Sequence, residues 1–161
     1  MKQITPIQIS QLADAAQASP RRRANLNMHA ELADPIQRLA IAMEPDTLVR
    51  PHRHPHTWEL LYPLAGRFLV LHFDEAGYVI ERCVLGAEAA VLETSAGVWH
   101  AVLSLDQDGV IFEVKHGPYM PIAEQDFAAW GPADGEELVP ALLAWYATAQ
   151  VGDRFEAQVI S

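Results

Sequence analysis

The segment PHRHPHTWELLYPLAGRF, residues 51–68, places His52, His54 and His56 at alternate positions. Glu59 follows the middle histidine by five residues, and a glycine follows seven residues later. Residues two apart on a strand point to the same face, so His52 and His54 can direct their imidazole nitrogens at one point. The segment therefore predicts a metal site, with a polar, histidine-rich loop as the alternative.

A third imidazole is available from His100, in SAGVWHAVLS, where a later run of strand-forming residues begins after a glycine turn. Three imidazoles and one carboxylate suit a divalent first-row ion, which readily takes five or six ligands and so keeps positions open for water or substrate. We therefore expect one divalent transition metal, zinc, iron, manganese or nickel. The alternative is a metal-free cavity that keeps the same residues as hydrogen-bonding groups. Because Pro55 interrupts the strand, His56 is expected in a loop or behind the ligands.

The middle of the chain consists of short runs rich in β-branched, aromatic and aliphatic residues. They are bounded by turn-forming residues, and no helical pattern separates them. These features predict an antiparallel sandwich or barrel. The runs are GRFLVLHF, YVIERCVL, AVLET, VWHAVLSL and GVIFEVK.

The two ends of the chain have helical periodicity instead. Apolar residues recur at helical spacing within residues 1–20, before Ser19-Pro20, and again within residues 136–150. We expect a single domain over residues 1–161, with strands over about 37–116 and a tail over about 117–161. The stretch over residues 21–45 could hold a strand pair or a short helix, and strands are favoured after residue 37. The C-terminal helix is expected to pack against the strands or against a second subunit.

Composition excludes several classes of function. The formal net charge of −10 and the pI near 5.0 would repel a nucleic acid, and the basic run Arg21–Arg23 is too short to offset them. No apolar run approaches the roughly 20 residues of a membrane span, and the N-terminus does not resemble a signal peptide. A cytoplasmic location is therefore predicted. Cys83, the single cysteine, forbids an intrachain disulfide and is expected to be a small apolar strand residue.

Two motifs carry a resemblance to the cupin superfamily. HRHPHTWELLYPLAG resembles the first cupin motif, and SAGVWHAVLS resembles the second, with Ser95 where proline is usual and Ser104 where asparagine is usual. Over roughly residues 45–116 the resemblance implies a double-stranded antiparallel β-helix, or jelly-roll, barrel. It implies a ligand set comprising His52, His54, Glu59 and His100. A homodimer is expected from the resemblance alone.

A narrower likeness extends over most of the chain. SPRRRANLNMH, DPIQRLAIAMEPDTLVRPHRHP, WELLYPLAGRF and FEVKHGPY resemble the WbuC-type cupin-fold metalloproteins, whose genes are often found with those for surface-polysaccharide biosynthesis. That family has no firmly assigned reaction. The likeness therefore implies a fold and a metal more than a chemistry.

Several polar residues are candidates for binding a substrate. The cations Arg50, Arg67 and Lys115 could meet an anionic group, although a solvated outer face would also explain them. The donors Arg23, Asn25 and Asn27 could recognise sugar hydroxyls or phosphate; salt bridges are the alternative for the arginine run. Tyr119 could line the cavity or belong to the core.

These residues lead to two functional hypotheses. In the first, the protein is a metal-dependent enzyme, of isomerase, epimerase or dioxygenase type, acting on a small polar or sugar-derived molecule. Glu59 would orient or share charge with the metal, and His56 would move a proton. In the second, the same cavity holds a sugar or nucleotide sugar without catalysis, because fold does not determine function. A metal-free epimerase is a weaker third option.

Overall fold

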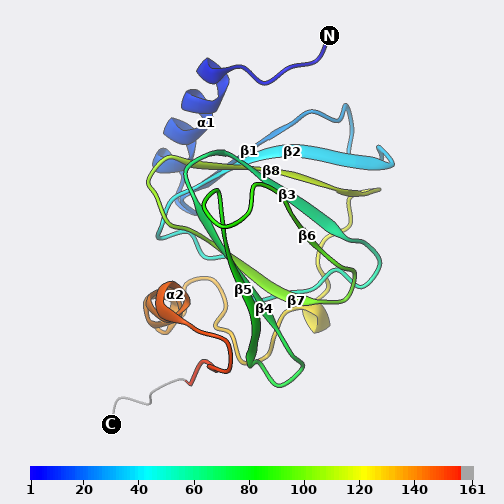
Figure 1. Ribbon diagram of the computed structural model, residues 1–161. Helices are drawn as coiled ribbons and strands as arrows, with labels where there is room; N and C mark the ends of the chain where they lie inside the picture. Colours follow the sequence, from blue (N-terminus) through cyan, green and yellow to red (C-terminus); the bar gives the residue numbers. More distant parts are fainter. Residues whose placement is uncertain (157–161) are drawn as a thin grey trace.

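The computed structural model describes residues 1–156 and contains two antiparallel sheets that face each other (Figure 1). The larger sheet, sheet A, has the order β1-β2-β8-β3-β6, and the smaller, sheet B, has the order β5-β4-β7. The strands are β1 (Arg23–Asn27), β2 (Ile36–Met43), β3 (Glu59–Ala65), β4 (Phe68–Phe73), β5 (Val79–Leu85), β6 (Leu92–Thr94), β7 (Trp99–Ser104) and β8 (Gly109–His116). This mostly-β, jelly-roll architecture with a helix near each end confirms the predicted fold class, although the two sheets do not close on each other.

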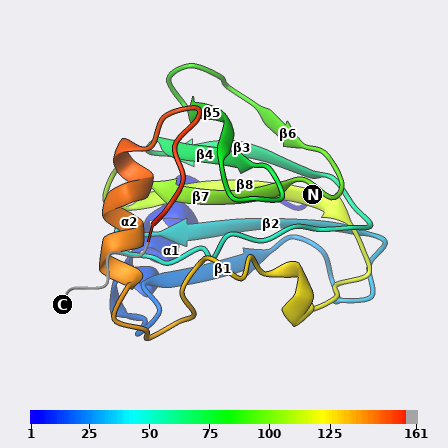
Figure 2. The ribbon, with the colours of Figure 1, turned by 90° about the horizontal axis from the view of Figure 1, so that it is seen from below.

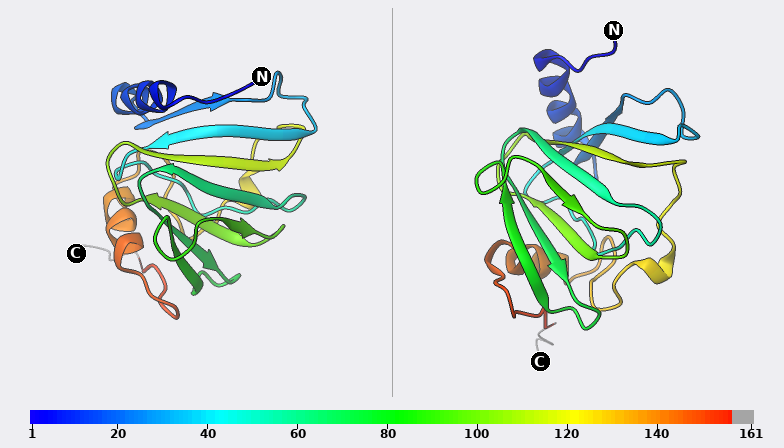
Figure 3. Two further views of the ribbon diagram at one scale, coloured as in Figure 1. Left: turned by 45° about the horizontal axis from the view of Figure 1, so that its top comes forward. Right: turned by 45° about the vertical axis from the view of Figure 1, so that its right-hand side comes forward.

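Helix α1 (Pro6–Ala18) covers the outer face of sheet A (Figure 3). Its start is fixed by a capping box, in which the Gln8 amide N–H donates to the Thr5 hydroxyl and the Thr5 amide N–H donates to the Gln8 side chain. Its buried residues pack against small apolar residues of β2 and β8. The predicted N-terminal helix is therefore present and lies outside the sandwich.

Helix α2 (Val139–Thr148) covers the outer face of sheet B, with Leu142 and Tyr146 fully buried against it. The segment between β8 and α2 carries the short 3-10 helix η1 (Glu124–Asp126) and runs along the side of the sandwich (Figure 2). Within residues 1–156, no helix has both the length and the apolar character that a bilayer crossing requires.

The core between the sheets is built by alternation along the strands. Inward-facing residues of sheet A meet those of sheet B in one cluster, which includes Ile41, Leu61, Phe68, Val102 and Ile111. All six residues of β4 are buried, because sheet A covers one face of this strand and α2 covers part of the other. Sheet B therefore sits between two apolar layers.

Two strands of sheet A, β1 and β3, were not assigned from the sequence. Residues before β2 form a strand, β1, rather than a short helix, and β1 pairs with β2 in antiparallel register. β3 lies inside sheet A although it contains Pro63, because the register shifts between Pro63 and Ala65 and this irregularity accommodates a residue without an N–H. Gly66, directly after β3, has a φ of 72°, a left-handed conformation that favours glycine, and the Cα of Gly109 lies 3.3 Å from where a Cβ would be.

Candidate metal centre

Four side chains converge at one end of the sandwich. His52, His54, Glu59 and His100 each present one possible ligand atom, and these atoms all lie within 4.8 Å of one another. Glu59 is the first residue of β3 in sheet A, whereas His100 is the second residue of β7 in sheet B. His52 is joined to β7 by two backbone hydrogen bonds with His100, of 3.0 and 2.8 Å. The candidate ligands therefore come from both sheets and from the segment before β3.

Backbone carbonyl groups orient two of the imidazoles. Nδ1 of His52 lies 2.8 Å from the carbonyl oxygen of Arg50, and Nδ1 of His100 lies 2.9 Å from that of Val98. A carbonyl oxygen only accepts, so each Nδ1 carries the proton and each Nε2 keeps a free lone pair. This is the usual arrangement of an imidazole that ligates a metal through Nε2.

The polar atoms at the centre are short of hydrogen-bond partners. Nε2 of His54 and Nε2 of His100 are buried and accept or donate no hydrogen bond within residues 1–156. They lie 3.1 and 3.7 Å from the two carboxylate oxygens of Glu59. Unsatisfied buried nitrogens are costly, and coordination would satisfy them. The donor set of three nitrogens and one oxygen fits a divalent first-row ion, so the cluster could bind a metal.

The electrostatics of the cluster suit metal binding. Burial, helped by the neighbouring His100, lowers the pKa of His52 well below its usual value, and burial also lowers the pKa of His100. Burial alone would raise the pKa of Glu59. The contact with His54 outweighs burial, together with the proximity of His100 and Lys115, so the pKa of Glu59 lies well below its usual value. At neutral pH the two imidazoles are thus neutral and the carboxylate is ionised, which are the states that bind a metal.

These shifts predict that the metal-free chain loses stability in acid. When the pH falls below about 6.5, unfolded histidines take up protons while His52 and His100 in the folded chain remain neutral. The unfolded state then binds more protons, so the free energy of unfolding falls; Glu59 adds a further loss below about 4.3. We expect the melting temperature of the chelator-treated chain to decrease steadily from pH 7 to pH 4.5. The melting temperature of the His100→Gln variant should decrease less steeply with falling pH. Equal slopes for the two chains would show that His100 is not a source of the acid sensitivity.

A polar cluster behind the ligands ties their segments together. The side chain of Arg53, which lies between His52 and His54 in the chain, donates to Asp126 Oδ1 at 2.9 Å and to Glu75 Oε1 at 3.3 Å. The indole of Trp99, the neighbour of His100, donates to Glu75 Oε2 at 3.0 Å, and the Arg53 guanidinium lies 4.5 Å from the Trp99 ring centroid. Glu75 therefore contacts one residue from each of the two segments that carry the histidines.

The buried Asp126 should consequently affect metal affinity without being a ligand. Besides its side-chain contact with Arg53, its carbonyl oxygen accepts from the Arg53 amide at 3.0 Å. We expect Asp126→Asn to weaken metal binding about 10- to 100-fold, the range found for residues that orient ligands. Asp134→Asn, which changes an exposed carboxylate paired with Arg21, is the matched control. Isothermal titration with zinc measures the metal affinity of both variants. Equal affinities would contradict a role of Asp126 in positioning the ligands.

Polar residues of β8 extend the site along the inner face of sheet A. Lys115 Nζ lies 2.8 Å from Glu113 Oε1 and 3.6 Å from Glu59 Oε2, so it bridges the two carboxylates. Burial and the charge of Glu59 raise the pKa of Glu113. The sequence predicted Lys115 as a binding residue but gave Glu113 no role. Its position two residues from Lys115 on the same strand face was the signal that could have found it.

The other predicted binding residues lie on the segment before β3, on β1 and after β8. Arg50 precedes His52, and its guanidinium lies 4.2 Å from the Phe127 ring centroid and 3.7 Å from Glu124. Arg23 is the first residue of β1, and Tyr119, which follows β8, is half exposed. Asn25 and Asn27 are exposed on β1 and joined by a side-chain hydrogen bond of 3.1 Å.

The structure does not bring two of the predicted residues to the cluster. Arg67 directly precedes β4, at the end of that strand remote from His72, which pairs with His100. It is bound there to Asp106 at 2.7 Å. His56 is exposed in the turn between His54 and β3 and is not among the four converging residues.

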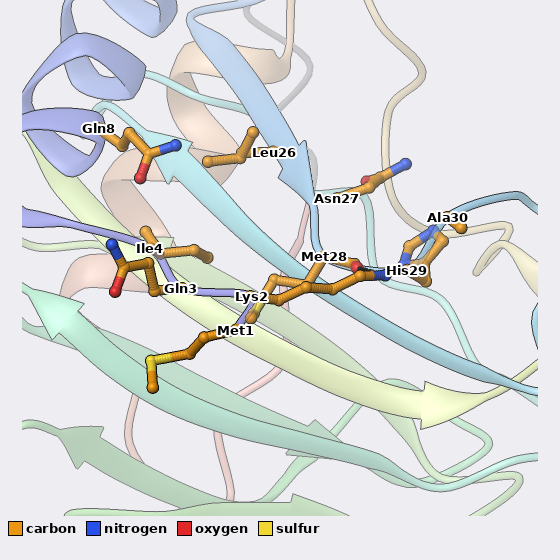
Figure 4. A pocket seen from close by; sticks show the side chains of 10 residues that line it. All are labelled: Met1, Lys2, Gln3, Ile4, Gln8, Leu26, Asn27, Met28, His29 and Ala30. Atoms are coloured by element: carbon orange, nitrogen blue, oxygen red, sulfur yellow. Dashed lines mark hydrogen bonds between the residues drawn. The ribbon is translucent and has the colours of Figure 1, made fainter.

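Two cavities have linings that include none of the four converging residues. The first, of about 530 Å³, is bounded by residues 1–4 and by residues 26–30 at the free edge of β1 (Figure 4). The second, of about 400 Å³, includes His72, Glu81 and Cys83 from β4 and β5. His72 links the sheets there, with Nε2 3.0 Å from the Thr94 hydroxyl. Burial raises the pKa of the Cys83 thiol, in keeping with a structural rather than a reactive cysteine.

Comparison with solved structures supports the cupin fold. KdgF from Halomonas sp. is 14% identical, with a TM-score of 0.50, over 63% of this chain and 84% of KdgF. Oxalate oxidase in complex with the substrate analogue glycolate is 15% identical, with a TM-score of 0.52, over 66% of this chain and 57% of the oxidase. CapF with the inhibitor 3-isopropenyl-tropolone is 15% identical, with a TM-score of 0.54, over 64% of this chain and 30% of CapF.

These neighbours are cupin-fold proteins, and at such identities the likeness concerns the fold alone. No curated protein matches the chain. A family model matches residues 4–85, just over half of the chain, and includes β1 to β5 and three of the four converging residues. The chain therefore belongs to the family described as Domain of unknown function (DUF6016).

Proposed function

We propose that the protein is a metal-dependent enzyme that acts on a small polar or sugar-derived molecule. The metal would be held by His52, His54, Glu59 and His100. One observation carries this proposal: three imidazoles and one carboxylate, drawn from both sheets and from the segment before β3, present their ligand atoms within 4.8 Å of one another. Such a cluster is expensive to build in a buried position unless a cation occupies its centre.

The surrounding residues would bind and orient the substrate. The bound ion would supply Lewis-acid chemistry, which here means polarisation of an oxygen atom of the substrate or of a small co-reactant. Lys115 offers donors beside Glu59, and Glu113 offers an acceptor on the same face. A proton-transfer role for His56 would require the turn that carries it to move towards the cluster, because this side chain is exposed.

The finer assignment rests on the sequence resemblance to WbuC-type cupins. That resemblance supports a substrate linked to surface-polysaccharide biosynthesis and a homodimeric state. Light scattering on the purified chain tests the dimer directly. Sugar nucleotides are the natural first substrates to try, since they are the activated precursors of polysaccharides.

Turnover is the decisive test of the proposal. The zinc-, iron-, manganese- and nickel-loaded chains should be incubated separately with a panel of sugar nucleotides, and new products sought by mass spectrometry. We expect a product with at least one metal, and its loss after chelator treatment, with recovery on adding the metal back. Binding without any product would favour the non-catalytic alternative, and failure to bind metal at all would overturn the proposal.

A further inference from the structure

The cavity of about 530 Å³ beside β1 contains a buried histidine that the candidate metal centre does not use. His29 follows the last residue of β1 by two positions, is 5% exposed and lines this cavity (Figure 4). In sheet A, β2 and β8 lie between β1 and β3, the strand that carries Glu59. The cavity is therefore separate from the four converging residues.

The backbone of β2 fixes the tautomer of His29. The Arg38 carbonyl oxygen accepts from the Met28 amide at 2.8 Å, and in a regular antiparallel pair the Arg38 N–H would return a bond to the Met28 carbonyl. It donates instead to Nδ1 of His29 at 3.0 Å. Nδ1 is equally far from the Arg38 carbonyl oxygen, but it satisfies the N–H only as an acceptor. Nδ1 therefore carries the lone pair, and Nε2 carries the proton.

The Nε2–H group of His29 is a donor that lacks an acceptor. This nitrogen is buried and makes no hydrogen bond within residues 1–156. Because Nδ1 points towards β2 and Nε2 lies on the far side of the ring, the N–H points towards the free edge of β1, which the cavity borders. A buried donor without an acceptor is costly, and an acceptor atom of a bound molecule would satisfy it.

The charges of the cavity lining favour an anion. Within residues 1–156, Lys2 is the one charged side chain that lines the cavity and no carboxylate does, although the chain carries a net charge of −10. Lys2 Nζ donates to the Met28 carbonyl oxygen at 3.1 Å, which holds the ammonium group beside the peptide bond that precedes His29. Its other two donors are available to a ligand. Ile4, Leu26 and Met28 add apolar surface to the lining.

We propose that this cavity binds a small organic acid, whose carboxylate accepts from the His29 Nε2–H and from the Lys2 ammonium group. Its apolar body would pack against the apolar part of the lining. The two oxygen atoms of a carboxylate match one charged and one neutral donor. A phosphate dianion would bring a second negative charge that the single cation leaves unbalanced. This site lies outside the proposed metal-dependent reaction and requires no metal ion.

The test uses hexanoate as the probe and the chelator-treated chain, so that no carboxylate can bind through a metal ion. Hexanamide has the same shape without the charge, and butyl phosphate carries the other kind of anion. Ligand-observed NMR measures the three affinities. We expect hexanoate to bind about 10-fold or more tightly than hexanamide, as for hydrogen bonds to a charged group, and more tightly than butyl phosphate.

Two variants remove the two donors separately. Lys2→Met keeps the aliphatic stem without the charge, and because Lys2 is exposed this variant should fold normally. His29→Asn keeps an acceptor at the position of Nδ1, since the amide oxygen is equally far along the side chain, but has no donor at the position of Nε2. Each should weaken hexanoate binding by about 10-fold. Arg21→Gln, which removes a cation from an exposed ion pair with Asp134, is the control and should leave it unchanged.

Long-range proton–nitrogen NMR spectra measure the tautomer directly. They should show His29 protonated at Nε2, with the Nε2 signal shifting when hexanoate is added. Protonation at Nδ1, no binding of hexanoate to the unsubstituted chain, equal affinities in all three variants, or tighter binding of butyl phosphate would overturn the assignment. Because the chain in these experiments is free of metal, their failure would leave the proposed function untouched.

Discussion

The His100→Ala variant should purify without stoichiometric metal, and its metal affinity should be lower by more than about 100-fold. Residues that merely orient ligands contribute 10- to 100-fold, so loss of a ligand should exceed that range. His100 is 1% exposed and is held by β7, so no other side chain can take its place without moving a strand. Metal content after dialysis, by mass spectrometry, and a competition titration with a chromophoric chelator give the two measurements.

His56→Ala is the matched control for this experiment. His56 lies in the same histidine-rich segment as the ligands, but it is exposed and outside the converging group. We expect this variant to keep its full metal content. If His100→Ala also keeps it, the ligand assignment is wrong, whatever the activity of either variant.

Replacing Tyr146 with alanine should lower the free energy of unfolding by about 3–5 kcal/mol, as for other large buried aromatic side chains. Tyr146 is fully buried at the centre of the apolar layer between α2 and sheet B, with Leu142 beside it. Removing the ring would leave a cavity under a helix of only ten residues. Urea denaturation of the metal-free chain measures the change.

Tyr146→Phe separates the ring from the hydroxyl group. The hydroxyl donates to the carbonyl oxygen of Val49 at a long 3.3 Å, and such a bond contributes about 1 kcal/mol or less. We therefore expect this variant to lose far less stability than Tyr146→Ala. A cost below about 1 kcal/mol for both variants would show that α2 contributes little to the stability of sheet B.

The strands were predictable because their signals are local. Alternation and turn residues marked five runs, and these match the strands β4 to β8, with β8 extending one residue beyond its run. The C-terminal helix is shorter than the predicted 136–150, starting at Val139, because Pro140 lacks an N–H and fits only within the first helical turn. β3 was harder to recognise, since its proline is tolerated only through the irregular register beside it.

The sequence was a better guide to the four converging side chains than to the residues around them. Motif spacing and the cupin resemblance indicated His52, His54, Glu59 and His100. Spacing says nothing about which end of a sandwich a turn occupies, however, and Arg67 lies at the other end of β4. The contact between Arg53 and Asp126 joins residues 73 positions apart, a pairing that only the folded topology creates.

The division of the candidate ligands between two sheets has a consequence for local opening. An ion bound at this point would act as a cross-link between β3 and β7, so its binding free energy would also oppose the separation of those strands. At a free-metal concentration of about 1,000 times Kd this adds about 4 kcal/mol. Amide hydrogens of both strands should then exchange more slowly in deuterated water when the chain is metal-loaded, with little change in α1.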